Sequence, residues 1–158
     1  MKSLSTGIVF AHLCATWFMI GLIWTIHTVH YPLFADVGSA TYTTFQLHHV
    51  ERIGRLLLVP WGVEGLTALI ILISVWRSKD RGLYVPVLVG SIAMGVVLIV
   101  SGFFSAPAHA DLADGFDAAV HARLMKADLV RTIAWTIRGL TALWIAAVLW
   151  RRTSSSNR

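Results

Sequence analysis

Four long apolar stretches alternate with polar connections along the chain. They cover roughly residues 7–27, 56–76, 83–104 and 129–150. As an α-helix rising about 1.5 Å per residue, each is long enough to cross the hydrocarbon core of a bilayer, which is about 30 Å thick. The pattern predicts an all-α protein, an integral membrane four-helix bundle that forms a single membrane domain over residues 1–158.

The composition supports a membrane location. Hydrophobic residues make up 56% of the 158 residues and charged residues 13%, whereas soluble proteins contain about 25% charged residues. A water-soluble globular domain is therefore excluded. Because Cys14 is the only cysteine, a domain held together by intrachain disulfides is excluded as well.

The basic residues predict an orientation. A short hairpin at residues 77–82 joins the second and third stretches, and an even number of spans puts it on the same side as both termini. The positive-inside rule makes this side cytoplasmic. The basic residues that it carries are Lys2, Arg77, Lys79, Arg81, Arg151, Arg152 and Arg158. The net charge of +5 then reflects membrane topology, and nothing in the sequence indicates nucleic-acid binding.

A sequence echo links the second and fourth stretches. Residues 61–69 (WGVEGLTAL) resemble residues 135–143 (WTIRGLTAL), which suggests two pseudo-repeated helix pairs, with chance similarity between apolar helices as the alternative. The echo places Glu64 and Arg138 at equivalent positions inside two parallel spans. Because an isolated charge there is costly, we expect the two side chains to form an ion pair.

Most titratable residues outside the cytoplasmic set gather at the opposite, outer face. Six of the seven histidines lie in or beside the two long connections: His27, His30, His48, His49, His109 and His121. At about 100° per residue, His27 and His30 share one face near the end of the first stretch. Before and within the last stretch, one face also combines several polar groups, namely His121, Asp128, Arg131 and Arg138, with Trp135. Histidine, carboxylate and guanidinium groups from three helices can therefore face one pocket.

Neutral imidazole is the commonest protein ligand for metal ions, and helical proteins build metal sites from inward-facing histidines and carboxylates. The leading hypothesis is a small integral membrane metalloprotein, an oxidoreductase with copper, iron or zinc. The expected metal ligands are His30, His49, His109 and His121, with His27 and His48 as substitutes. In this hypothesis Glu64 and Asp117 are ligands or proton carriers, and Arg52, Arg131 and Arg138 balance charge or hold an anionic or quinone-like substrate.

Haem b is a less favoured form of the same hypothesis, with His30 and His49 as axial ligands. The histidine spacing matches no established metal motif such as H-E-x-x-H. A proton-coupled carrier or small-solute channel is an alternative, which four short helices could form only as a homo-oligomer. A third class is a structural or assembly subunit, in which the polar cluster is a docking surface. Short amphipathic helices are expected in the outer connections, at residues 41–50 and 115–128.

Several motifs taken together resemble a group of small bacterial four-helix membrane proteins. In the first half they are the run His30-Tyr31-Pro32-Leu33-Phe34, then His49-x-x-Arg52, then Glu64. The second half matches P-x-H-x-x-L-x-x-G-x-D at residues 107–117 and R-T-x-x-W-x-x-R at residues 131–138, and Asp128 stands where the group typically has Asn. The resemblance covers nearly the whole chain. It implies a bacterial cytoplasmic membrane protein with this fold and this site, but no particular reaction.

Overall fold

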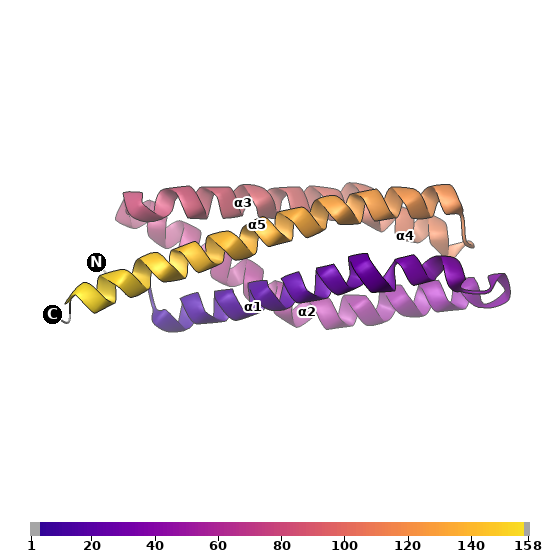
Figure 1. The fold of residues 1–158 in the computed structure, drawn as a ribbon, viewed down its shortest axis with the longest axis horizontal. Coiled ribbons are helices and arrows are strands. Elements are labelled where there is room, and N and C mark those ends of the chain that lie inside the picture. The colour runs from indigo at the N-terminus through magenta and orange to yellow at the C-terminus, as the bar shows by residue number, and fades with distance from the viewer. Residues whose placement is uncertain (1–3, 157–158) are drawn as a thin grey trace.

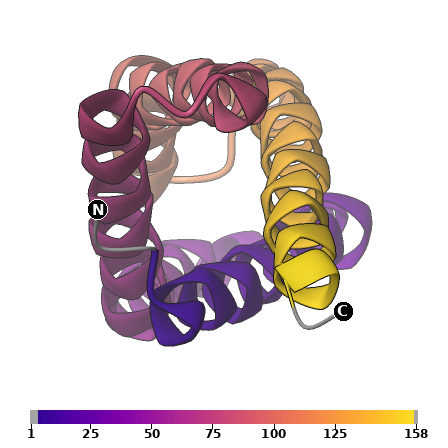
Figure 2. The same ribbon diagram turned by 90° about the vertical axis from the view of Figure 1, so that its left-hand side faces the viewer.

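The computed structural model describes residues 4–156, which are almost entirely helical and contain no strand. Four long helical rods lie side by side, with successive rods running in opposite directions along the long axis of the molecule (Figures 1 and 2). The first rod is α1 (Thr6–Thr25) with its continuation η1 (Ile26–His30), and the short η2 (Pro32–Asp36) follows. The second rod is α2 (Ser39–Ser78). The third comprises α3 (Arg81–Val100), η3 (Ser101–Ser105) and α4 (Ala106–Ala113), and the fourth is α5 (Ala118–Ser156).

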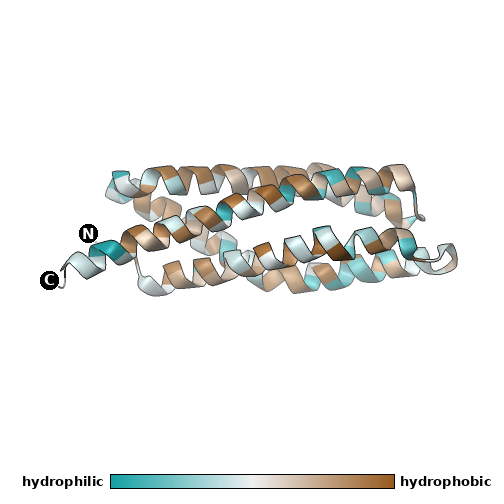
Figure 3. Cartoon of the chain, viewed as in Figure 1, coloured by the Kyte–Doolittle hydropathy of each residue, from teal (hydrophilic) through white to brown (hydrophobic). Residues whose placement is uncertain are grey.

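All four rods are long and apolar enough to cross a membrane, and Figure 3 shows hydrophobic residues concentrated along their middle parts. The predicted all-helical fold is confirmed. At about 1.5 Å per residue, the 40 residues of α2 extend about 60 Å. This is twice the thickness of the hydrocarbon core. Each rod therefore has room for a helical extension outside the membrane.

These extensions replace the separate loop helices expected at residues 41–50 and 115–128: residues 41–50 belong to α2, and residues 118–128 form the start of α5, preceded by a short turn. Tyr42, Gln46 and His49 are buried along the first extension. Their spacing of i, i+4 and i+7 is that of one helix face. Because this face packs inward and residues 39–55 contain no proline, the helix continues without a break.

The connections between the rods lie at the two ends of the molecule. The hairpin between α2 and α3 lies at the same end as the start of α1 and the end of α5 (Figure 1). Lys79 ends α2 in the left-handed conformation, with a φ of 54°, and the Asp80 side chain accepts a hydrogen bond from the backbone N–H of Gly82 at the start of α3. At the other end Gly115 has a φ of 144°, a conformation that side-chain-bearing residues rarely adopt.

Three apolar clusters follow one another along the rods. The first, at the end far from the termini, includes Tyr31, Phe34, Tyr42 and Leu124. The second includes Ile20, Val97 and Trp135, and the third, near the hairpin, includes Ile71, Leu83 and Ile145. Buried polar side chains lie within the first cluster and between the second and third. The apolar layers thus separate two polar sites.

Two π-helical segments interrupt the rods near the first cluster. One is η1, which carries His27 and His30, and the other is η3, which leads into α4. A π-turn forms i to i+5 hydrogen bonds and so places more residues in each turn than an α-helix, and such turns are frequent at functional sites. The two histidines, expected to share one face, contact different partners: His27 contacts Asp128, and His30 contacts His49.

Candidate functional site

The four expected metal ligands come together at the end of the molecule opposite the termini. They are supplied by four different segments, with His30 on η1, His49 on α2, His109 on α4 and His121 on α5. The fully buried ring of Phe34 contacts all four imidazoles, at ring-centroid distances of 5.4, 5.0, 6.3 and 6.2 Å in that order. We call these five residues with Tyr31 and Gln46 the histidine cluster.

His49 is the central imidazole of the histidine cluster. Its ring centroid lies 4.8 Å from that of His30 and 5.2 Å from that of His109. Its Nδ1 shares a hydrogen bond of 2.8 Å with Nε2 of His30. Its Nε2 is buried and has no hydrogen-bond partner within the described residues. An unpartnered buried polar atom is uncommon in folded proteins, and an absent ion or water is one physical reason for it.

His109 is held by a network that fixes its tautomer. The side-chain amide nitrogen of Gln46 donates to the backbone carbonyl of His109, at 3.2 Å, and also lies 2.9 Å from its Nδ1. Because an NH₂ group only donates, Nδ1 accepts and the ring proton is on Nε2. That Nε2 lies 2.8 Å from the Tyr31 hydroxyl, to which it donates. Both nitrogens of His109 therefore have partners.

His121 has one nitrogen engaged and one available. Its Nε2 lies 2.8 Å from the backbone carbonyl oxygen of Tyr31. A carbonyl only accepts, so this nitrogen carries the proton and Nδ1 presents a lone pair. Orientation of a histidine through its second nitrogen is the arrangement that metal-ligating histidines normally have. Its ring packs against Phe34 and Phe116 rather than against another imidazole.

The remaining predicted residues lie around the histidine cluster or outside it. His27 contacts the fully buried Asp128, with 3.1 Å between Nδ1 and Oδ2, and Arg131 lies 3.8 Å from the other carboxylate oxygen. His48 and Arg52 are exposed on α2. Asp117 is exposed as well, and its side chain caps the start of α5 by accepting from the N–H of Val120, at 2.8 Å.

Glu64 and Arg138 form the expected ion pair, fully removed from the histidine cluster, between the second and third apolar clusters. Arg138 also donates to the backbone carbonyl of Gly90, at 2.6 Å. Thr16 donates to the Glu64 carboxylate, at 3.4 Å, and His12 lies 3.9 Å from it. Two sites on the chain thus contain buried polar groups, one at the end and one in the middle of the rods.

Four residues of the two polar sites were not predicted from the sequence as functional residues, namely Tyr31, Phe34, Gln46 and His12. The first two lie in the quoted run at residues 30–34 and are fully or almost fully buried. Gln46 is also fully buried, one turn before His49. The sequence feature that could have identified Gln46 is its position on the same helix face as His49. His12 lies 3.1 Å from the Thr67 hydroxyl, a contact between distant segments that no local pattern indicates.

As they stand, no three His, Cys, Asp or Glu side chains among residues 4–156 are arranged to hold a metal ion. The free nitrogen lone pairs of the histidine cluster do not converge on one point, and Phe34 packs against all four imidazole rings. No protein-family model, curated protein or solved structure matches this chain. The function must therefore be inferred from the site itself.

Proposed function

We propose that this protein is a small integral membrane metalloprotein whose histidine cluster binds a single transition metal ion, and that it acts as an oxidoreductase. The observation that supports the proposal is the buried, unpartnered Nε2 of His49, whose imidazole packs against those of His30 and His109. A bound cation satisfies this nitrogen, and imidazole nitrogens are good ligands for copper, iron and zinc.

His49 would hold the ion together with neighbouring imidazoles. His30 and His109 are the nearest, since their ring centroids lie 4.8 and 5.2 Å from that of His49. His109 would bind through Nε2 once its ring proton moves to Nδ1 and the Gln46 amide turns so that its oxygen, which has no partner among the described residues, accepts from Nδ1. Because His121 packs against Phe34 and not against another imidazole, we expect a subset of the four histidines, completed by water or substrate, rather than all four around one ion. Binding requires side-chain rotations within the cluster.

A metal ion fits this site better than haem. His30 and His49 are hydrogen-bonded directly to each other, with 2.8 Å between the two nitrogens. Axial ligands of haem lie on opposite faces of the porphyrin, so they cannot be in contact. Phe34 and Phe45 also pack against the same pair of imidazoles. A porphyrin would have to displace this aromatic packing.

A one-sided pocket is favoured over a transport path. A carrier or channel needs polar access from the histidine cluster to the hairpin end of the molecule. The second apolar cluster, with Trp135 and Val97, lies between the two polar sites, and the third, with Leu83 and Ile71, lies beyond them. We place the histidine cluster on the outer face of the cytoplasmic membrane, because the basic hairpin lies at the other end of the rods.

The proposal is tested by titrating the detergent-purified protein with Cu²⁺, Fe²⁺ or Zn²⁺ in competition with a chelating dye. We expect saturable binding of one ion, strongly weakened in His49→Ala. The matched control is His48→Ala, because the adjacent His48 is exposed. Equal affinities for the two variants would overturn the proposed site. Binding of zinc alone would retain the metal site but exclude the redox function, since zinc has no redox chemistry.

A further inference from the structure

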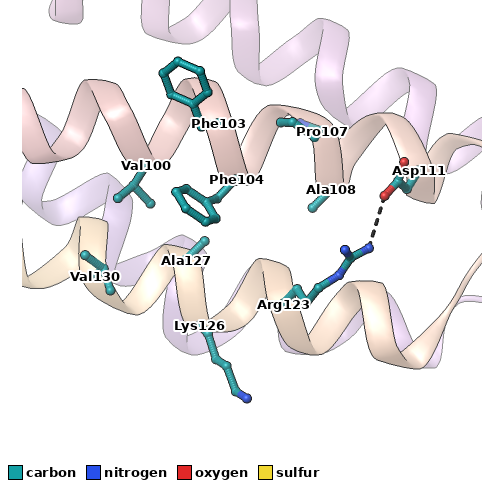
Figure 4. Close-up of a pocket in the computed structure, with 10 residues that line it drawn as sticks. All are labelled: Val100, Phe103, Phe104, Pro107, Ala108, Asp111, Arg123, Lys126, Ala127 and Val130. Atoms are coloured by element: carbon teal, nitrogen blue, oxygen red, sulfur yellow. Dashed lines mark hydrogen bonds and ion pairs between the residues drawn. The ribbon is translucent and has the colours of Figure 1, made fainter.

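A half-open groove of about 450 Å³ lies on the surface between the third and fourth rods (Figure 4). Its apolar part is formed by η3 and the adjoining ends of α3 and α5, with Val100, Phe104 and Val130. Its polar part is formed by α4 and the first turns of α5, with Asp111, Arg123 and Lys126. None of these residues belongs to the histidine cluster.

The groove changes character along the rods. Phe104 is 60% exposed and Val130 is 45% exposed, so the apolar walls face the surroundings of the protein. Asp111 follows Phe104 by seven residues and Arg123 precedes Val130 by seven residues. On a helix this separation is about 10 Å. Hydrophobic surface therefore passes into charged surface over the distance between the acyl chains and the head groups of a lipid.

The charged end of the groove is cationic. The Arg123 guanidinium lies 3.2 Å from the Asp111 carboxylate, and the two side chains are 67% and 55% exposed. An exposed pair of this kind contributes little stability, so a phosphate can compete for the guanidinium. Lys126 adds a second positive charge and makes no ion pair within the described residues. Figure 4 shows its side chain extending from α5 away from Phe104 and Ala108, so its ammonium group reaches a bound phosphate by rotation of the side chain.

We propose that this groove binds one anionic phospholipid. An acyl chain lies against Val100, Phe104 and Val130, and the phosphate contacts Arg123 and Lys126. Charge complementarity selects an anionic lipid over a zwitterionic one, since the head-group end carries two cations and one carboxylate. The site is independent of the proposed metal centre, and its test requires no metal.

The test is native mass spectrometry of the full chain in a neutral detergent, with phosphatidylglycerol and phosphatidylcholine of the same acyl chains at equal concentration. We expect the wild type to retain one phosphatidylglycerol in preference. The double variant Arg123→Gln/Lys126→Gln should reduce this preference by roughly 5- to 30-fold, because each basic residue near an anionic surface contributes about fivefold. The control Arg55→Gln, which removes an exposed arginine outside the groove, should leave the preference unchanged.

A steric pair of variants tests the apolar part. Val130→Trp fills the groove, whereas Ile133→Trp changes an exposed residue on the same helix that does not line it. We expect the tightly retained lipid to be lost in the first variant and kept in the second. Equal retention of the two lipids by the wild type, an unchanged preference in the charge variant, or equal behaviour of the two tryptophan variants would overturn the proposal. So would tight retention of a lipophilic molecule other than a phospholipid.

Discussion

Single buried polar atoms are where this chain departs most from an ordinary apolar membrane helix. Nε2 of His49, Oε2 of Glu64 and Nε of Arg138 are buried without hydrogen-bond partners among the described residues. Leaving such an atom unpaired costs about 1–3 kcal/mol, and more when the group is charged. At His49 and at the Glu64–Arg138 pair, the chain can retain such atoms only if the groups have a function or stabilise one another. The Glu64–Arg138 pair is the case in which mutual stabilisation can be measured.

We predict strong coupling between Glu64 and Arg138. Glu64→Gln or Arg138→Gln alone leaves an uncompensated buried charge, which typically costs about 3–5 kcal/mol. The double substitution should cost clearly less than the sum of the two single substitutions. The free energies of unfolding of the four proteins in detergent micelles measure this difference. Strict additivity would show that the contact contributes nothing.

At the scale of single residues, the sequence predicts the four histidines of the site but not the residues that surround them. The polar character of His30, His49, His109 and His121 against apolar helices is visible in the sequence itself. The role of Phe34 is not, because a buried phenylalanine beside an apolar stretch has the same pattern whether it packs against leucines or against four imidazoles. The contact of Gln46 with His109 joins residues 63 positions apart and depends on how α2 and α4 pack.

At the level of helices, close approach and end geometry determine how the rods fit together. Arg138 on α5 reaches the backbone of α3 at Gly90, where a side chain would meet Thr141 at 2.9 Å. The hairpin between α2 and α3 is joined to the end of α5 through Asp80 and Arg152, whose Oδ1 and Nη2 atoms lie 3.0 Å apart.

We predict that Gly90→Ala destabilises the protein by about 1–3 kcal/mol, the usual cost of adding a methyl group to a packed site. The added carbon would press on Thr141 and weaken the bond from Arg138 to the Gly90 carbonyl. The control is Gly95→Ala on the same helix, where no atom lies within 4 Å. It should be neutral or stabilising by up to about 1 kcal/mol, because alanine favours the helix. Unfolding in detergent compares the two, and equal stabilities would contradict the close approach.

The Asp80–Arg152 contact predicts a pH dependence. The hydrogen bond from Arg152 holds the pKa of Asp80 below its usual 3.8. A depressed carboxyl pKa contributes stability above the unfolded value, and this stability is lost as the pH falls through the folded value. Arg152→Gln should therefore lower the unfolding free energy by up to about 1 kcal/mol at pH 7, as expected for a partly exposed pair.

The difference between wild type and Arg152→Gln should shrink as the pH falls below about 3.8, because Asp80 then takes up a proton in the unfolded chain and, at still lower pH, in the folded protein. Arg151→Gln is the matched control, since this neighbouring arginine is exposed and forms no ion pair within residues 4–156. A difference that stayed constant from pH 7 to pH 2 would show that Arg152 acts through packing and not through its charge.

On the scale of the whole molecule, the polar sites are ordered along the rods. The histidine cluster lies at one end, and Glu64 and Arg138 lie in the middle. The basic hairpin lies at the other end, with the start of α1 and the end of α5. The length and hydropathy of the apolar stretches were sufficient to predict four long helices and the end of the molecule at which each connection between them lies. They could not predict that α2 and α5 continue as single helices beyond the apolar stretches, because the buried faces of those extensions are packed against segments distant in sequence.

The central claim is that the histidine cluster binds a transition metal ion, and elemental analysis of protein purified from metal-replete cells tests it most directly. We predict about one equivalent of copper, iron or zinc per chain in the wild type and in His48→Ala. We also predict loss of that metal in His49→Ala, with helical content unchanged by circular dichroism. A wild-type protein without stoichiometric metal, or a His49→Ala protein that keeps it, would contradict the proposed metal site.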